Sequence, residues 1–285
     1  MNMPALAFDA HTHIFPDAIG PRVVAQLAAT LPLPTSYNGT RDGLLRKLAE
    51  AGIAGSLNAP VATRADQVDA INIWAAEQNR WPILSLGAMH PDYPDIPTEL
   101  RRVKDRGLPG IKLHPEYQGF APDEPRLDII WRTCRELGLI ILLHAGNDWQ
   151  FPPPCRANPA AIARVVRAWP GLTLIAAHFG GFEQWEAVAH ELVGLPLYLD
   201  TSFAVGFLPD DQFVRLVRQH SSARVLFGSD APWQDPPATL AAFRRLPFTP
   251  PEQHAILWAN AARLFHLEEH ACPATSAARK EPSCM

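Results

Sequence analysis

Short apolar segments alternate with helix-like segments from one end of the chain to the other. Eight apolar segments end near His13, Asn58, His90, His114, His144, His178, Ser202 and Asp230. From residue 13 to residue 230 the seven intervals average 31 residues, which is enough for a strand, a helix and two loops. This alternation indicates a parallel sheet whose strands are joined by crossover helices.

The strands and helices differ in their apolar pattern. Leu139–His144 and Leu172–His178 are almost continuously apolar until their last residue, which is typical of strands buried on both faces. Asp66–Asn79 and Asp123–Leu137 have apolar residues at steps of three and four, which predicts outer helices. Pro251–Leu267 has the same pattern and is expected to be an additional C-terminal helix.

The first strand excludes the main alternative fold. An open doubly wound sheet is expected to have a glycine-rich phosphate loop there, whereas this chain has His11-Thr-His13. We therefore predict an α/β protein, a single-domain (β/α)8 TIM barrel over residues 1–267 with the extra C-terminal helix. Residues 268–285 lack periodicity and are predicted to form a mobile tail.

Composition narrows the class of protein further. The chain has 285 residues, a net charge of −4 and no run of Lys or Arg, so we expect no nucleic-acid and no membrane partner. The N-terminal residues lack the basic and long apolar regions of a signal peptide. The four cysteines have no zinc-finger spacing, which suits a reducing compartment. We therefore expect a cytoplasmic protein.

Metal-ligand side chains occur where the predicted strands end. The residues are His11, His13, His144, His178 and Asp230. In a parallel barrel the carboxyl ends of all strands meet at one mouth, so these side chains should lie close together. Histidines with one carboxylate suit Zn²⁺, although Mn²⁺, Fe²⁺ or Co²⁺ would accept the same donors. The sequence therefore predicts a divalent metal site, with Zn²⁺ as the expected ion.

Several motifs together resemble a known superfamily. They are Phe8-Asp9-Ala-His11-Thr-His13, Gly110-Ile-Lys-Leu-His-Pro115, His144-Ala-Gly146, His178-Phe-Gly-Gly181 and Phe227-Gly-Ser-Asp230. Residues 5–267 are similar to the amidohydrolase superfamily, and within it to the amidohydrolase-related group containing aminocarboxymuconate-semialdehyde decarboxylase. The resemblance implies that His11, His13, His144 and Asp230 hold a divalent metal. It also implies that His178 lies beside the metal and orients or deprotonates its water.

Lys112 leaves the number of metals open. Its segment is also similar to the fourth strand of dihydroorotases, where a carboxylated lysine bridges two metals. Lys112 and His114 should share one strand face, and an uncompensated buried ammonium would be costly. An ion pair with Asp or Glu, or contact with a substrate carboxylate, is the favoured alternative. We therefore expect one metal, with two as the alternative and with Lys112 and His178 as additional candidate ligands.

Loops after the strands supply candidates for a substrate pocket. We predict that His114, Trp149, Arg156 and Trp233 bind a small organic substrate, with Arg156 as a carboxylate clamp. Asp200 closes the seventh strand and is expected either to orient a ligand histidine or to cap a loop. Homodimers are common among barrels of this kind, but no exposed apolar stripe marks an interface.

Three functions follow from these residues. The leading prediction is a hydrolase that cleaves a C–N or C–O bond of a small amide, cyclic amide, lactone or ester. A metal-activated water would attack, Asp230 would move the proton, and His178 would hold the water or the substrate. The alternative is a metal-dependent nonoxidative decarboxylase or hydratase of an aromatic or muconate-like acid. A barrel that binds a ligand without catalysis is the third possibility.

Overall fold

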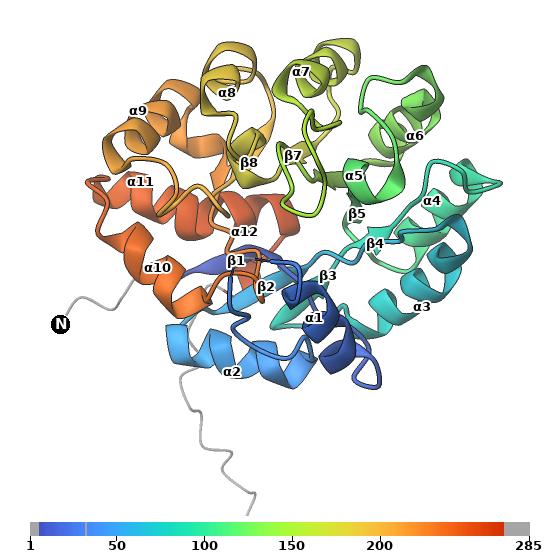
Figure 1. The fold of residues 1–285 in the computed structure, drawn as a ribbon, viewed down its shortest axis with the longest axis horizontal. Coiled ribbons are helices and arrows are strands. Elements are labelled where there is room, and N and C mark those ends of the chain that lie inside the picture. Colours follow the sequence, from blue (N-terminus) through green and yellow to red (C-terminus); the bar gives the residue numbers. More distant parts are fainter. Residues whose placement is uncertain (1–5, 32, 271–285) are drawn as a thin grey trace, which may run out of the picture.

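Parallel strands form the centre of the computed structural model, which describes residues 6–31 and 33–270 (Figure 1). Every pair of neighbouring strands is parallel. The strands are β1 (Phe8–Thr12), β2 (Gly55–Asn58), β3 (Ile83–Ser85), β4 (Gly87–Ala88), β5 (Gly110–Leu113), β6 (Ile140–Leu143), β7 (Leu174–Ala176), β8 (Tyr198–Asp200) and β9 (Val225–Leu226).

Hydrogen bonds join the strands into a closed ring. Leu86 N donates to Asn58 O at 2.9 Å, so β3 and β4 are two parts of one strand interrupted at Leu86. Ala10 N donates to Phe227 O at 2.8 Å, which joins the last strand to the first. A closed ring with eight strand positions is a (β/α)8 barrel, as the sequence predicted.

Helices surround the ring and connect successive strands (Figure 1). They are α1 (Gly20–Ala28), α2 (Arg41–Ala51), α3 (Val68–Gln78), α4 (Ile96–Asp105), α5 (Pro115–Gln118), α6 (Asp128–Leu137), α7 (Pro159–Ala168), α8 (Trp185–Glu191), α9 (Asp210–His220) and α10 (Pro236–Arg244). In Figure 1, α1 lies inward of the ring of outer helices, in the connection that follows β1. No helix within the described ranges is long and apolar enough to span a membrane.

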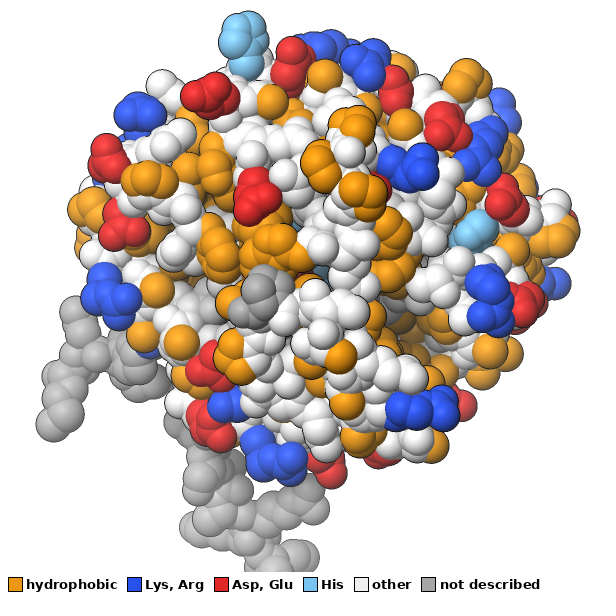
Figure 2. Space-filling view, in the orientation of Figure 1, with side chains coloured by type: hydrophobic (Ala, Val, Ile, Leu, Met, Phe, Trp, Pro, Cys, Tyr) orange, Lys and Arg blue, Asp and Glu red, His pale blue; other side chains and the backbone are white. Residues whose placement is uncertain are grey.

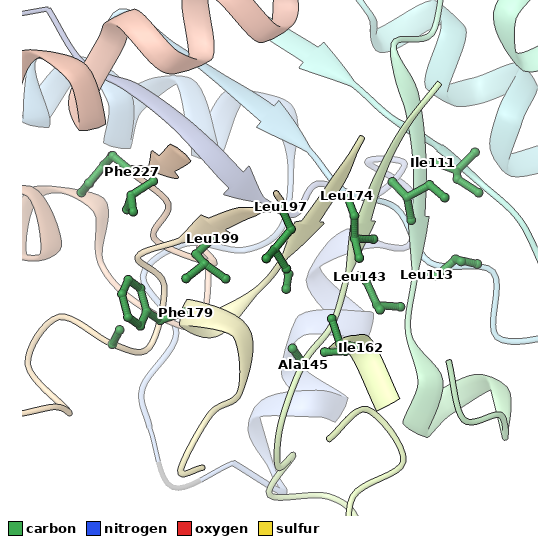
Figure 3. Close-up of a cluster of buried hydrophobic side chains, with 14 of the residues drawn as sticks. Ile111, Leu113, Leu143, Ala145, Ile162, Leu174, Phe179, Leu197, Leu199 and Phe227 are labelled. Atoms are coloured by element: carbon green, nitrogen blue, oxygen red, sulfur yellow. The ribbon is translucent and has the colours of Figure 1, made fainter. Parts of the chain in front are cut away.

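Strand β6 shows why the sequence of a barrel strand is continuously apolar. Ile140 and Leu142 belong to the inner hydrophobic cluster, whereas Ile141 and Leu143 belong to the outer one. Figure 3 shows Leu143 and Leu174 of neighbouring strands near Ile162 of α7. Both faces of the strand are therefore buried, so alternation with polar residues is lost.

The chain closes with the additional helix that the sequence predicts. It consists of α11 (Pro250–His254), a π-helical turn (Ala255–Ala259) and α12 (Asn260–Phe265). Ile256 O accepts a hydrogen bond from Phe227 N at 2.9 Å, which holds the π turn against the last strand. Glu268–His270 form a 3₁₀ turn, and the His270 ring stacks on Trp81 with centroids 3.9 Å apart. The rest of the predicted tail, residues 271–285, lies outside the described residues.

The register of β5 depends on the close approach of Gly110 to β6. Gly110 pairs with Ile140, and Lys112 pairs with Leu142. A Cβ atom on residue 110 would lie 1.9 Å from the backbone oxygen of Ile140, which is far inside van der Waals contact. Only glycine allows this spacing, and the spacing places Lys112 in the interior of the barrel.

We expect Gly110→Ala to lower the free energy of unfolding by about 3 kcal/mol or more, because the strands must separate to accept the methyl group. Gly138→Ala is the matched control. Its Cβ would meet nothing within 4 Å, so only its φ of +69° opposes alanine. That conformation costs about 1–2 kcal/mol. Urea denaturation followed by circular dichroism measures both losses, and equal losses would contradict the argument.

Candidate metal centre

The mouth of the barrel contains a cavity of about 700 Å³. Its lining includes His11, His13, Lys112, His114, His144, Trp149, His178, Asp230 and Trp233 among the residues that the sequence predicts. The residues predicted to bind a metal and those predicted to bind the substrate therefore line the same cavity. Arg156 is not part of the lining.

His11, His13 and Asp230 form one of three groups of potential metal ligands that come together among the described residues. His13 Nε2 is 2.8 Å from Asp230 Oδ1, and His11 Nε2 is 3.3 Å from the same oxygen. One donor atom from each residue lies within 4.8 Å of the others, so the three could hold one metal ion. The register between β1 and β2 shifts between Asp9 and Thr12, which places a β-bulge beside His11. Such bulges redirect side chains near functional sites.

Asp230 combines burial with close histidine neighbours. Burial acts to raise the pKa of its carboxyl group, but the nearby His11 and the hydrogen bond with His13 outweigh it and hold the pKa below its usual value. The carboxylate is therefore ionised at neutral pH, as a metal ligand or a proton acceptor must be. Its backbone has a φ of +57°, and His178 and Phe203 also have positive φ values of 55° and 51°. Such strain is common at functional sites.

Asp200 organises the histidines beneath the cavity. Its Oδ1 accepts hydrogen bonds from the backbone N–H of His178 at 3.1 Å and of Ser202 at 3.0 Å, and from the Ser202 hydroxyl. Its Oδ2 lies 2.9 Å from His11 Nδ1. Burial raises the pKa of Asp200, and the nearby His178 and the hydrogen bond from Ser202 oppose this rise. The role of orienting a ligand histidine, which the sequence suggests for Asp200, agrees with this geometry.

The hydrogen bonds that Asp200 accepts determine which ring nitrogens carry protons. Burial lowers the pKa of His11, His144 and His178 well below the usual value, so each ring is neutral. The Ser202 hydroxyl donates to Asp200, so its oxygen accepts from His178 Nδ1 at 2.9 Å. His178 Nε2 then accepts from His144 Nδ1 at 3.0 Å. His144 Nε2 is consequently left with a free lone pair, whereas the lone pair of His11 Nε2 faces Lys112 Nζ at 3.1 Å.

A metal ion fits these lone pairs. Among the described residues, His144 Nε2 is one of two buried side-chain polar atoms without a hydrogen-bond partner. An unpaired buried acceptor costs free energy, which a cation at this position would recover. The donor set of imidazoles and one carboxylate also matches what divalent transition metals prefer. The residues present therefore fit a divalent metal.

Lys112 is held inside the same site. It is 1 % exposed, and its Nζ lies 3.1 Å from His11 Nε2. Burial lowers the pKa of its ammonium to about 8, although Asp230 and Asp200 act in the opposite direction. Within the described residues it has no carboxylate at ion-pair distance, so the predicted direct ion pair with Asp or Glu is not formed.

His114 and Asp148 lie beside His144. The rings of His114 and His144 are stacked with centroids 3.9 Å apart, and His114 Nε2 is 3.5 Å from Asp148 Oδ2. Burial raises the pKa of Asp148 to about 6. The predicted position of His114 near the substrate is therefore compatible with the cavity.

Arg156, the predicted carboxylate clamp, lies outside the cavity. Its side chain is half-exposed, and its Nε is 3.8 Å from Glu116 Oε2.

Aromatic side chains form one wall of the cavity. Trp149 meets Phe182 and Phe203 edge to face, with centroids 5.1 and 5.5 Å apart, and the rings of Phe182 and Phe203 are 5.5 Å apart. Phe182 and Ser202 were not among the predicted site residues. Phe182 directly follows the His178-Phe-Gly-Gly181 motif, but nothing in its sequence context distinguishes it from a core residue.

A (β/α)8 barrel with imidazole and carboxylate donors at its mouth defines a class of metal-dependent enzymes. The family model described as amidohydrolase matches residues 8–267, so the chain belongs to the amidohydrolase family. It is an enzyme of the amidohydrolase type, which argues against the non-catalytic barrel. No curated protein sequence matches the chain.

Solved structures with the same fold have low sequence identity to this chain. A TIM-barrel protein from Bordetella bronchiseptica has a TM-score of 0.77 and 19% identity, covering 93% of this chain and 99% of that one. A dihydroxybenzoic acid decarboxylase from Polaromonas sp. JS666, with manganese and 2-nitroresorcinol, has a TM-score of 0.67 and 18% identity, covering 92% and 97%. A probable 2-pyrone-4,6-dicarboxylic acid hydrolase from Acinetobacter baumannii, with citric acid, has a TM-score of 0.62 and 17% identity, covering 91% and 99%.

We expect Asp200→Asn to weaken the affinity for Mn²⁺ or Zn²⁺ by about 10- to 100-fold, the usual effect of losing a hydrogen bond that orients a metal ligand. The amide group donates as well as accepts, so it cannot receive protons from both His11 and Ser202. Isothermal titration calorimetry measures the affinity. Asp211→Asn on the outer helix α9 should leave it unchanged, and equal affinities for all three proteins would contradict the proposed role.

Proposed function

We propose that this enzyme is a metal-dependent nonoxidative decarboxylase of an aromatic or muconate-like carboxylic acid. The observation that carries the proposal is the aromatic wall of Trp149, Phe182 and Phe203 in the same cavity as the candidate metal ligands. Aromatic side chains pack well against a planar conjugated substrate. The manganese-containing decarboxylase with the same fold supports this order of preference over hydrolysis.

The proposed metal ligands are His11, His13, His144 and Asp230, with one divalent ion. When bound, the ion supplies positive charge that holds an oxygen of the substrate and stabilises the negative charge that develops in the reaction. The donor set suits both Zn²⁺, which the sequence suggests, and Mn²⁺, which the Polaromonas decarboxylase contains. We propose Mn²⁺ and Zn²⁺ as the two ions to test.

Asp230 is the proposed proton carrier. In decarboxylation the bond between the carboxylate and the neighbouring carbon breaks, carbon dioxide leaves, and the bonding electron pair takes up a proton at that carbon. Because its lowered pKa keeps Asp230 ionised, its carboxylate is available to accept a proton from a substrate hydroxyl or from water and to pass it to the carbon. Its position beside His13 keeps the carboxylate in one orientation.

His178 is proposed to position the site rather than to touch the substrate. Its Nδ1 faces Ser202 and its Nε2 faces His144, so both ring nitrogens already have protein partners. Lys112 has no such partner apart from His11, and we propose that its ammonium faces the carboxylate of the substrate. This role retains a single metal and needs no carboxylation of the lysine.

Hydrolysis of a C–N or C–O bond is the second candidate. It is favoured by the ionised Asp230, which could take a proton from water and deliver it to a leaving group. The probable hydrolase from Acinetobacter baumannii has the same fold and supports this candidate. The two reactions differ in where the substrate carbon lies relative to the metal, so product analysis distinguishes them.

We expect chelator-treated enzyme reconstituted with Mn²⁺ or Zn²⁺ to release carbon dioxide from at least one member of a panel of hydroxybenzoic and muconic acids. Chelator-treated enzyme to which no metal is returned should be inactive. Asp230→Asn should reduce turnover by about 100-fold or more, because the proton carrier is lost, whereas Asp211→Asn should retain full activity. Hydrolysis of a lactone or amide without any carbon dioxide release would overturn the decarboxylase in favour of the second candidate.

We expect Trp149→Ala to raise the KM for an aromatic substrate by about three- to tenfold with a smaller effect on kcat, because the ring contributes packing energy in the ground state. Trp169→Ala provides the control, since Trp169 lies outside the cavity lining, under Arg135. Steady-state kinetics on the active acid measures both. An unchanged KM in Trp149→Ala would show that the substrate does not lie against this wall.

A further inference from the structure

The cavity continues from the candidate metal centre into the space between α1 and α3. On this side its lining is dominated by apolar side chains. We call these residues the apolar compartment: Val23 and Leu27 of α1, and Ala70, Ile71 and Trp74 of α3. Figure 2 shows a hollow lined by hydrophobic side chains on the α3 side of α1. Because the same cavity contains His13 and Asp230, the compartment is continuous with the reaction site.

Helix α1 buries few of its residues against the protein core. Only Gly20 and Val24 of its residues are buried. Val23 and Leu27 are one helical turn apart, line the cavity and remain half-buried. A helix of a globular protein normally buries its apolar stripe against another element. Here the opposite side of the gap is formed by Ile71 and Trp74 of α3, which are also half-buried.

The size of the cavity points to a ligand larger than a single ring. Pockets of about 300–1,000 Å³ hold ligands of drug size, and this cavity measures about 700 Å³. A one-ring acid between the aromatic wall and the metal ligands would occupy only part of this volume. The remaining apolar volume would stay in contact with water unless the ligand extended into it.

The charged side chains near the compartment do not favour a second acidic group on the ligand. Arg64 also lines the cavity, but its guanidinium makes two hydrogen bonds with Asp66, at 3.0 and 3.1 Å. No other Lys or Arg of the described residues lines the cavity on this side, so an anionic group would find no unneutralised cation there. The part of the ligand in the compartment is therefore uncharged.

We propose that the substrate carries an uncharged apolar chain or ring on the side away from its carboxylate, and that the apolar compartment binds it. The inference rests on the proposed function for the orientation of the substrate, whose carboxylate would face Lys112 and the metal ligands. The enzyme would then select amphiphilic acids over small acids with the same reacting group. Ile71 and Leu27 would be residues that determine this specificity.

The test measures binding of straight-chain carboxylic acids, from butanoate to decanoate, to the Mn²⁺-loaded enzyme by isothermal titration calorimetry. We expect the Kd to fall by about three- to fourfold for each additional methylene group that enters the compartment. Alcohols of the same chain lengths should bind at least tenfold more weakly, because they lack the group that faces the metal centre. An affinity that does not depend on chain length overturns the inference, as do alcohols that bind equally well.

Variants on one helix provide the matched control. Ile71→Asp should abolish the dependence on chain length, because the charge lies in the compartment. Ile73→Asp makes the same change two residues further along α3, at a side chain that is 52% exposed and outside the cavity lining, and should preserve the dependence. Leu27→Asp tests the compartment from α1, where few side chains are buried, if Ile71→Asp fails to fold. Folded variants that all retain the dependence overturn the inference.

The outcomes separate this inference from the proposed function. Chain-length dependence without carbon dioxide release from any acid supports the compartment and overturns only the decarboxylase. Carbon dioxide release without chain-length dependence overturns only the compartment. Sedimentation velocity tests whether a second copy of the chain fills the gap between α1 and α3. A dimer that dissociates in Leu27→Asp and Ile71→Asp would show this and overturn the inference.

Discussion

Closure of the barrel between its last and first strands is the constraint on which the site depends. Ala10 N donates to Phe227 O, and Asp230 N donates to His11 O at 2.7 Å, so the two ends of the sheet are held together by backbone groups. His13 thereby meets the carboxylate of Asp230 although 217 positions separate them in the sequence. No local interaction could bring these donors together. The strong apolar burial of the strands therefore also pre-organises a cation site.

Within that frame, one buried carboxylate orders the rest of the site. In its ionised form Asp200 only accepts hydrogen bonds, so His11 and Ser202 both donate to it. The direction of each hydrogen bond then follows through His178 to His144. The result is two histidine nitrogens that present lone pairs to the same cavity. A few backbone strains at the strand ends, including the positive φ of Asp230, are retained because this network and the surrounding core hold them in place.

The cavity joins two environments with different chemistry. At its inner end, neutral histidines and Asp230 suit a cation and an anionic reacting group. Toward the solvent, the aromatic wall and the half-buried faces of α1 and α3 suit an uncharged, flat or extended substituent. The family match spans residues 8–267 and therefore includes every residue of the inner end. The outer walls come from the loops after the strands and from the faces of α1 and α3, and such loops vary without changing the barrel.

The sequence by itself determined the barrel, its family and the polar residues that follow its strands. These features depend on the spacing of apolar residues and on the order of motifs along the chain, which can be read directly from the sequence. Only the tertiary structure decided which residues meet. It placed a bulge beside His11, linked Ser202 and His178 to His144, added Phe182 to the aromatic wall, and left Arg156 outside the cavity. It also opened the gap between α1 and α3. The physical reason is that contacts between distant segments depend on loop conformation and packing, for which neither periodicity nor spacing leaves a signal.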